Sequence, residues 1–126
     1  MKIFECESCN DVWIKLQVAE TMNCCQNELH QVKENMDPEV IETHTPIIKK
    51  MGDFIYVEVN KEHPMLDVHH LELIIIETNH GVHVKKLFSQ NLIKAQFILT
   101  EGEVIINIYV YCNVHHLIKI TDINLS

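Results

Sequence analysis

The sequence predicts an all-β protein made of a small cysteine-rich N-terminal segment followed by a β-sandwich or β-barrel. Four of the five cysteines fall within residues 1–36, where large aliphatic side chains are few. From Thr45 onward, short runs rich in β-branched and aromatic residues follow one another at the spacing of sandwich strands. No stretch of the 126 residues has a pattern that predicts a helix.

The N-terminal segment, residues 1–36, is predicted to be one domain, and residues 37–126 a second. A segment with so few apolar side chains is marginal alone, so it needs a metal or a partner to hold it. Residues 35–38 predict the linker, because they are polar and end in a proline that disfavours helix before it.

Six runs in the second domain are predicted as strands because of their β-branched and aromatic content. They comprise residues 54–59, 71–77, 82–88, 95–100, 104–111 and 116–120. Asn79, His80 and Gly81 predict a turn between the second and third runs. Residues 101–103 predict a tight hairpin between the fourth and fifth runs, in which Gly102 supplies a positive φ.

Composition excludes several classes of protein. The formal net charge of −8 argues against nucleic-acid binding, which needs a basic face. No apolar run is long enough to span a bilayer, and the first residues lack the apolar core of a signal peptide. We therefore expect a cytoplasmic protein, where clustered cysteines are more often metal ligands than disulfides.

The N-terminal cysteines form a predicted metal site. Cys6 and Cys9 are spaced as a C-x-x-C knuckle, and the adjacent pair Cys24 and Cys25 completes a set of four thiols. Four thiolates in a tetrahedron suit iron or zinc, and their spacing does not choose between the two metals. A zinc staple and a set of free thiols are the alternatives.

A second site is predicted near the C-terminal end. Cys112 and His115, three residues apart after the strand 104–111, can reach one metal ion. His44, His63 and His69 offer three more imidazoles upstream. Imidazole suits iron and a thiolate adds softness, whereas no helical His-x-x-x-His pair supports a zincin-type site.

Six motifs follow one another along the chain: Cys6-x-x-Cys9, Cys24-Cys25, Glu42-x-His44-x-Pro46, His63-Pro64-Met65, His69 and Cys112-Asn113-x-His115. This ordered combination resembles desulfoferrodoxin, the two-iron form of superoxide reductase, over nearly the whole chain. The resemblance implies a desulforedoxin-like four-cysteine iron domain followed by an immunoglobulin-like β-sandwich. It also implies reduction of superoxide to hydrogen peroxide by one electron, at an iron that an external donor re-reduces.

The resemblance also assigns roles to the residues of the second site. His44, His63, His69 and His115 are expected around the equator of the iron, with Cys112 axial and the position opposite sulfur open. The implied partners are superoxide as substrate, a rubredoxin-like electron donor and a second copy of the chain in a homodimer.

Glu42 matches the family glutamate that caps the open position in the oxidised state; a solvated loop carboxylate is the alternative. Thr43 stands where the family commonly has a lysine that attracts superoxide. Lys49, Lys50 or Lys61 are candidates to replace it.

Other positions carry further expectations. Asn10, Gln26 and His116 stand where the family usually has glycine. Asn113 and Ile118 are expected to position backbone amides near the Cys112 sulfur, as such hydrogen bonds tune a metal thiolate. The remaining histidines are expected to have no part in the site: His70 faces away from it, His80 and His83 are solvated beside a turn, and His30 lies in the small domain.

Two other functions compete with superoxide reduction. A non-catalytic iron-binding or electron-transfer protein would keep the ligands without turnover. A zinc-stabilised β domain would serve as an interaction module. Metal content separates the zinc domain from the others, and reaction with superoxide separates the enzyme from the carrier.

Overall fold

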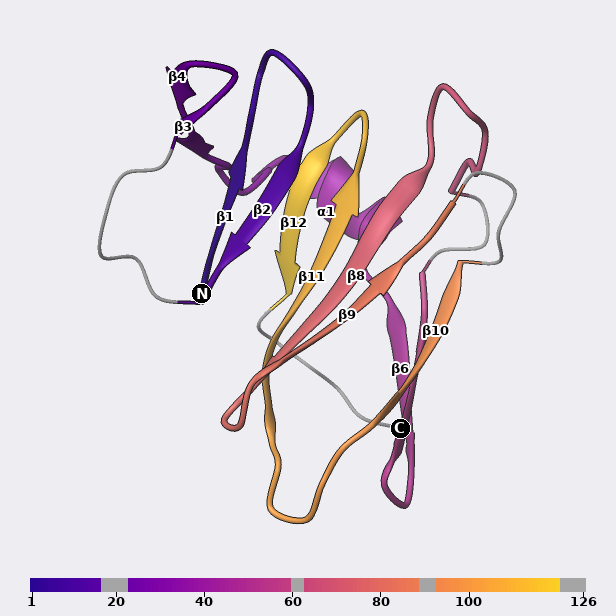
Figure 1. Ribbon diagram of the computed structural model, residues 1–126. Coiled ribbons are helices and arrows are strands. Elements are labelled where there is room, and N and C mark those ends of the chain that lie inside the picture. Colours follow the sequence, from indigo (N-terminus) through magenta and orange to yellow (C-terminus); the bar gives the residue numbers. More distant parts are fainter. Residues whose placement is uncertain (17–22, 60–62, 89–92, 121–126) are drawn as a thin grey trace. The chain divides into compact units, whose positions relative to one another are not determined.

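The computed structural model describes residues 1–16, 23–59, 63–88 and 93–120, and in these the chain is nearly all-β (Figure 1). Contacts divide the chain into two compact units, Met1–Lys33 and Glu34–Ser126. The polar residues 35–38, which predicted a linker, therefore belong to the second unit. Within the described part of the chain, no helix is long and apolar enough to cross a membrane.

The first unit is a small arrangement of short strands. They are β1 (Lys2–Glu5), β2 (Val12–Lys15), β3 (Asn23–Cys24), β4 (Asn27–Glu28) and β5 (His30–Gln31). One sheet has the order β2-β1-β5, and β3 pairs with β4 as a separate hairpin. Cys6 and Cys9 lie in the turn after β1, Cys24 ends β3, and Cys25 lies in the turn between β3 and β4.

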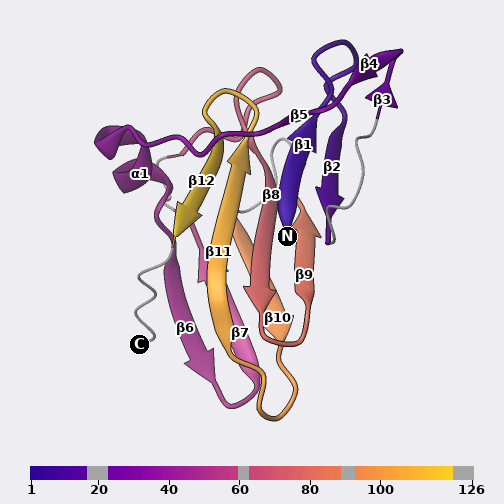
Figure 2. The same ribbon diagram turned by 90° about the vertical axis from the view of Figure 1, so that its left-hand side faces the viewer.

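The second unit is a β-sandwich of two antiparallel sheets. Its strands are β6 (Ile47–Met51), β7 (Phe54–Glu58), β8 (Leu71–Thr78), β9 (Val82–Lys86), β10 (Lys94–Ile98), β11 (Ile105–Cys112) and β12 (His116–Ile120). The sheets have the orders β10-β7-β6 and β12-β11-β8-β9. Figure 2 shows them as two layers. The all-β prediction is confirmed, and the sandwich holds rather than the barrel.

The core lies between the two sheets. In β7, Ile55 and Val57 are buried while Phe54 and Tyr56 are exposed, which is the period of two of a half-buried strand. Facing them are fully buried side chains of the larger sheet, including Ile74, Ile76, Ile108, Val110 and Ile118. Each such side chain stabilises the fold by about 1.5–3 kcal/mol.

The predicted hairpin at residues 101–103 is wrong. β10 pairs with β7, whereas β11 pairs with β8 and β12, so this turn crosses from one sheet to the other. Gly102 does have the expected positive φ, at 80°. A sandwich commonly connects its sheets in this way, and the sequence pattern of two neighbouring strands does not say whether they pair.

A short helix precedes the sandwich and was not predicted. Helix α1 (Pro38–His44) begins after Asp37, whose side chain accepts a hydrogen bond from the Glu39 N–H. Proline at the first helical position favours a helix start, because it has no N–H to leave unsatisfied. Seven residues are too few for a helical period to be visible in the sequence.

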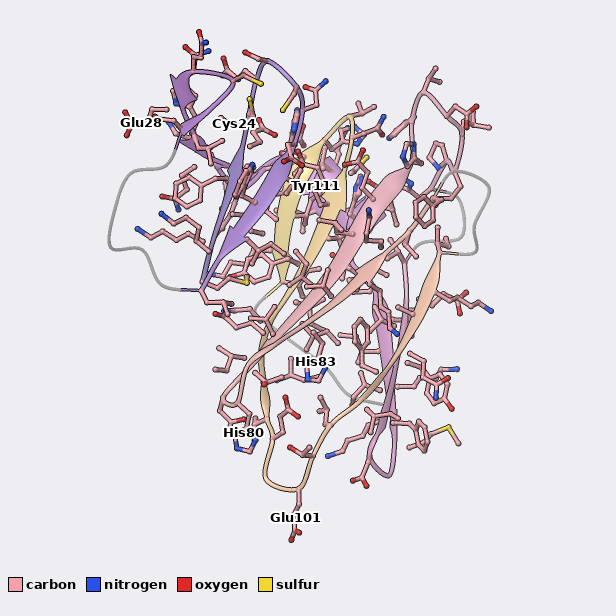
Figure 3. All side chains as sticks on the ribbon, viewed as in Figure 1. Cys24, Glu28, His80, His83, Glu101 and Tyr111 are labelled. Atoms are coloured by element: carbon pink, nitrogen blue, oxygen red, sulfur yellow. The ribbon has the colours of Figure 1, made fainter. Side chains whose placement is uncertain are left out.

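Glu103 joins the two sheets at one end of the sandwich. Its carboxylate accepts hydrogen bonds from the Thr78 hydroxyl (2.6 Å), His83 Nε2 (2.8 Å) and the Thr100 N–H (3.0 Å). These bonds, that from Thr78 first, lower the pKa of Glu103 to about 2. His83, which was expected to be solvated, is therefore held by this carboxylate; Figure 3 shows it near His80 at that end.

Replacing Glu103 by glutamine is expected to lower the free energy of unfolding by about 1–3 kcal/mol, because an amide cannot accept from all three donors. The pKa of this group is about 2 in the folded state against an ordinary 4.5, so its contribution is complete above pH 4.5 and declines as the pH falls toward 2. Urea unfolding at several pH values measures both effects. Glu101→Gln, at the exposed tip of the same turn, is the control and should change stability by less than about 0.5 kcal/mol. Equal stability of Glu103→Gln and the parent chain would contradict this role.

Candidate metal centres

The four N-terminal cysteines converge on one point of the first unit. The Sγ atoms of Cys6, Cys9, Cys24 and Cys25 all lie within 4.8 Å of one another, and none is in a disulfide. The Cys9 and Cys24 sulfurs are 3.6 Å apart. Four thiolates about 2.3 Å from one ion in a tetrahedron lie ~3.8 Å apart, so these positions fit a tetrathiolate metal.

Charges in this cluster also favour a cation. The main-chain N–H of Cys9, and after it that of Ser8, hydrogen-bonds the Cys6 sulfur and lowers the pKa of this thiol to about 7. The neighbouring sulfurs of Cys6 and Cys9 raise the pKa of Cys24 to about 12. Four sulfurs this close cannot all ionise without a positive charge between them.

Three positions at which the resemblance implies glycine fall on left-handed backbone. Asn10, Gln26 and His116 have φ values of 61°, 65° and 63°. Glycine adopts this conformation without strain, whereas other residues pay roughly 1–2 kcal/mol, asparagine least. Asn10 is therefore a tolerable replacement for glycine, whereas Gln26 and His116, like Cys25 at 52°, are strained.

Four histidines of the second unit form a closed ring of imidazoles. Neighbouring ring centroids are 4.5 Å apart for His44 and His63, 4.9 Å for His63 and His69, 5.1 Å for His69 and His115, and 4.9 Å for His115 and His44. The Nε2 atoms of His44 and His63 are 2.9 Å apart. Two nitrogens at right angles on one ion, each about 2.1 Å from it, would lie ~3 Å apart.

The Cys112 thiol lies beside this ring. Its Sγ is 3.5 Å from His63 Nε2 and 3.8 Å from His115 Nδ1. The ligand atoms of Cys112, His44, His63 and His115 all lie within 4.8 Å of one another. His69 is outside that set of four, yet its Nε2 is buried with no hydrogen-bond partner in the described part of the chain. A buried nitrogen of this kind calls for a partner, and a metal would supply it.

Backbone carbonyls orient two of the imidazoles. His44, the last residue of α1, donates from Nδ1 to the Val40 carbonyl at 2.7 Å. His63 donates from Nδ1 to the Pro64 carbonyl at 2.7 Å. These bonds fix the tautomer in which Nε2 carries a lone pair toward the ring centre, as outer partners of metal ligands do.

Burial favours the neutral forms of three of the imidazoles and of the Cys112 thiol, as their pKa values show. It lowers the pKa of His44 and His69, and that of His63 to about 4. It raises the pKa of Cys112, while the main-chain N–H groups of His115 and Val114 hydrogen-bond the sulfur and oppose the rise.

The prediction placed the amides of Asn113 and Ile118 near the Cys112 sulfur, but the N–H groups that hydrogen-bond it are those of His115 and Val114. Ile118 lies in β12, pairs with Val110 and is fully buried in the core, so it packs the sandwich instead.

The pKa of His63 gives the metal-free protein a pH dependence. A histidine with a pKa of about 4 in the folded state and an ordinary 6.5 unfolded opposes folding once protonated. The contribution of His63 to the free energy of unfolding is complete above pH 6.5 and is lost as the pH falls through 4. The loss is on the order of 3 kcal/mol from His63 alone. Urea unfolding of the metal-free protein measures this slope, and His63→Gln should flatten it. A slope that is unchanged in that variant would contradict the assignment, and His80→Gln, on an exposed turn, is the control.

Among the described residues, the other predicted ones are not members of the ligand cluster. Glu42 is exposed and in the last turn of α1, not on a loop as expected, and two residues from His44 it points to another side of the helix. Lys49 and Lys50 are exposed in β6, and Lys61 lies outside the described residues.

Two neighbours of the ring have other partners. The Thr43 hydroxyl donates to the Val40 carbonyl at 3.0 Å and lies 3.0 Å from His44 Nδ1, a contact that sequence reasoning missed. His70 donates from Nδ1 to the Leu66 carbonyl, and its Nε2 is 3.9 Å from Glu72. The Nδ1 of His70 is therefore used away from the ring, and its Nε2 lies near the Glu72 carboxylate.

Comparisons with known proteins agree with this geometry. A family model described as Desulfoferrodoxin matches residues 35–121. A "Desulfoferrodoxin homolog" of Archaeoglobus fulgidus is 28% identical over 119 residues, covering 93% of this chain and 94% of its own. A "Desulfoferrodoxin" of Clostridium acetobutylicum is 34% identical over 100 residues, covering 78% and 77%.

The fold is also found among solved structures. The crystal structure of the superoxide reductase from Treponema pallidum is similar with a TM-score of 0.77 and 21% identity, covering 94% of each chain. The four-cysteine cluster and the histidine–cysteine cluster are consistent with the two iron sites of desulfoferrodoxins.

Proposed function

Because the chain belongs to the desulfoferrodoxin family, we propose that it is a superoxide reductase, an enzyme that reduces superoxide to hydrogen peroxide. The proposed ligands of its catalytic iron are His44, His63, His69, His115 and Cys112. The observation that carries the proposal is the closed ring of buried imidazoles with a thiol beside it. Such a donor set has a use at a metal and none in packing a core.

The proposed reaction joins superoxide, one electron and two protons to give hydrogen peroxide. Ferrous iron, when bound, supplies the electron. The chain's own ligands set the local charge: four neutral imidazoles add nothing and one thiolate subtracts one, leaving +1 from the two charges of ferrous iron. A net charge of −8 on the whole protein repels an anion at long range, so attraction is confined to the vicinity of the site.

Residues around the ligands tune and hold the site. The carbonyls of Val40 and Pro64 hold two imidazoles in place. The N–H groups of His115 and Val114 withdraw electron density from the sulfur, which sets how strongly the thiolate donates to the metal. The proposal also includes a rubredoxin-like electron donor and a homodimeric, cytoplasmic protein.

A pulse of superoxide mixed with the reduced, iron-loaded protein tests the proposal. The iron of the histidine–cysteine site should be oxidised, with one hydrogen peroxide formed per iron and no oxygen released. Protein loaded with zinc is the control and should not react. A ferrous site that ignores superoxide would leave the electron-carrier alternative, and release of oxygen would indicate dismutation instead.

Glu42→Ala is expected to leave the rate of superoxide reduction within about twofold, because the carboxylate is exposed and is not part of the ligand cluster. Its proposed role is to bind the oxidised iron, which requires the last turn of α1 to rearrange. The absorption spectrum of the ferric protein should therefore change in this variant. Glu39→Ala, an exposed change in the first turn of the same helix, should not alter it. Ferric spectra that are the same in Glu42→Ala and the parent chain at every pH would rule out Glu42 as a ligand.

A further inference from the structure

Within the described part of the chain, no backbone carbonyl holds the imidazole of His69 as the carbonyls of Val40 and Pro64 hold those of His44 and His63. His69 lies in the loop before β8, where Leu66 and Val68 are 60% and 79% exposed and so add little packing. Its main chain exchanges two hydrogen bonds with Leu66, of 2.9 and 3.1 Å, which close a tight turn. The position of that turn relative to the rest of the ring needs another support.

Asn113 supplies that support from the other side of the site. Its Oδ1 accepts from the His70 N–H at 2.8 Å, and its Nδ2 donates to the Val68 carbonyl at 3.0 Å. Its own main-chain N–H donates to the His70 carbonyl at 3.2 Å. These three hydrogen bonds hold Val68 and His70, the residues on either side of His69.

The same residue follows Cys112 directly in the chain. Cys112 is fully buried at the end of β11, where it pairs with Leu71 of β8 and His116 of β12. One side chain therefore ties the loop of one ligand to the strand end that carries another. The carboxamide suits this because it both accepts and donates, whereas an aspartate lacks the donor.

We propose that Asn113 is a positioning residue that fixes His69 against Cys112 and so completes the metal site. The inference rests on the ligand set of the proposed function, but it concerns metal binding and not the reaction with superoxide. Loss of an outer partner of a metal ligand typically lowers metal affinity about 10–100-fold, and the same loss is expected for Asn113→Ala.

The chain offers a matched control at the other end of the sandwich. Asn79 donates from Nδ2 to the Gly102 carbonyl at 3.1 Å and accepts at Oδ1 from the Val104 N–H at 2.7 Å. It follows the eight-residue strand β8, which is about 26 Å long, whereas His69 precedes that strand, so the two lie at opposite ends of it. Asn79→Ala removes one donated and one accepted bond, as Asn113→Ala does, but touches no ligand loop.

The experiment is a competition between the full-length, reduced protein loaded with ⁵⁷Fe and a ferrous chelator. Mössbauer spectra separate the two sites, because four thiolates and an imidazole–thiolate set give different isomer shifts. Asn113→Ala should lose iron from the histidine–cysteine site at about 10–100-fold lower chelator concentration and keep the four-cysteine iron. Asn79→Ala should keep both.

A double-mutant cycle shows whether the effect passes through His69. In a His69→Ala background, Asn113→Ala should change the affinity of that site by less than about twofold. The inference is overturned if Asn113→Ala leaves affinity unchanged, if its effect persists without His69, or if Asn79→Ala has the same effect.

Two further measurements keep the inference testable should Asn113→Ala fold poorly. Asn113→Asp keeps the acceptor for His70 and removes the donor to Val68, so its affinity should lie between those of Asn113→Ala and the parent chain. Hydrogen exchange of the metal-free parent chain and of Asn113→Asp should show faster exchange of the His69 amide in the variant. Equal exchange and equal affinity would overturn the inference. A protein that binds iron as described but ignores superoxide would contradict the proposed function alone.

Discussion

Cys112→Ser is expected to abolish the reaction with superoxide and to leave the four-cysteine iron in place. Serine removes a negative, polarisable ligand and replaces it with a neutral hydroxyl that binds iron weakly. The loss should exceed about 100-fold in rate, since even outer partners of metal ligands are worth about 10–100-fold. Rapid mixing of the reduced variant with superoxide measures it.

The fold should tolerate this change. The N–H groups of His115 and Val114, which hydrogen-bond the sulfur, can also hydrogen-bond a serine oxygen. Circular dichroism checks that the sandwich persists. Cys25→Ser is the reciprocal control, because it disrupts the four-cysteine site and should leave the superoxide reaction intact. Turnover at the parent rate in Cys112→Ser would remove this residue from the ligand set.

Removal of metal from the four-cysteine site is expected to unfold Met1–Lys33 and to spare the second unit. Among the described residues of the first unit, the buried apolar side chains other than the ligand Cys6 are Ile3, Leu29 and Val32. They contribute less than roughly 10 kcal/mol, against about 1–2 kcal/mol of backbone entropy for each ordered residue. A structural metal contributes about 10–16 kcal/mol to domains of this kind.

The second unit has a large buried apolar core, which the described residues of the first unit lack. A buried cluster of sixteen residues spans both of its sheets, so its stability does not depend on a metal. Hydrogen exchange before and after chelation should show protection lost in β1 and β2 and retained in β8 and β11. Chelation of the Cys112→Ser protein should give the same result. Protection of β1 that survives removal of both metals would contradict the account.

Much of the fold was visible in the sequence. The runs Leu71–Thr78 and Ile105–Cys112 are long and rich in β-branched residues, so they were predicted nearly to their ends. β6 was missed because only Ile48 of Ile47–Met51 is buried, and the order Ile-Ile-Lys-Lys-Met hides the period of two. The pairing of β10 was mistaken because sheet membership depends on contacts far apart in the chain.

The candidate ligands were also visible, whereas their arrangement was not. The spacing of Cys112 and His115 indicates one site, but the cyclic order of the imidazoles follows from how a helix end, a loop and a strand end meet. Glu42 was misplaced for a related reason, because α1 is set by its cap and too short to be seen in a pattern. The hydrogen bonds from Asn113 to the His69 loop join segments more than forty residues apart, so the sequence does not show them, although the place of Asn113 next to Cys112 was a signal.

Anomalous diffraction at the iron edge, from crystals of the reduced, iron-loaded protein, tests the central claim most directly. We predict an iron bound by the Nε2 atoms of His44, His63 and His69, by His115 Nδ1 and by Cys112 Sγ, with a second iron among the four cysteines. An iron that lacks Cys112 or His69 as a ligand, or a ring of imidazoles with no anomalous peak beside it, would contradict it.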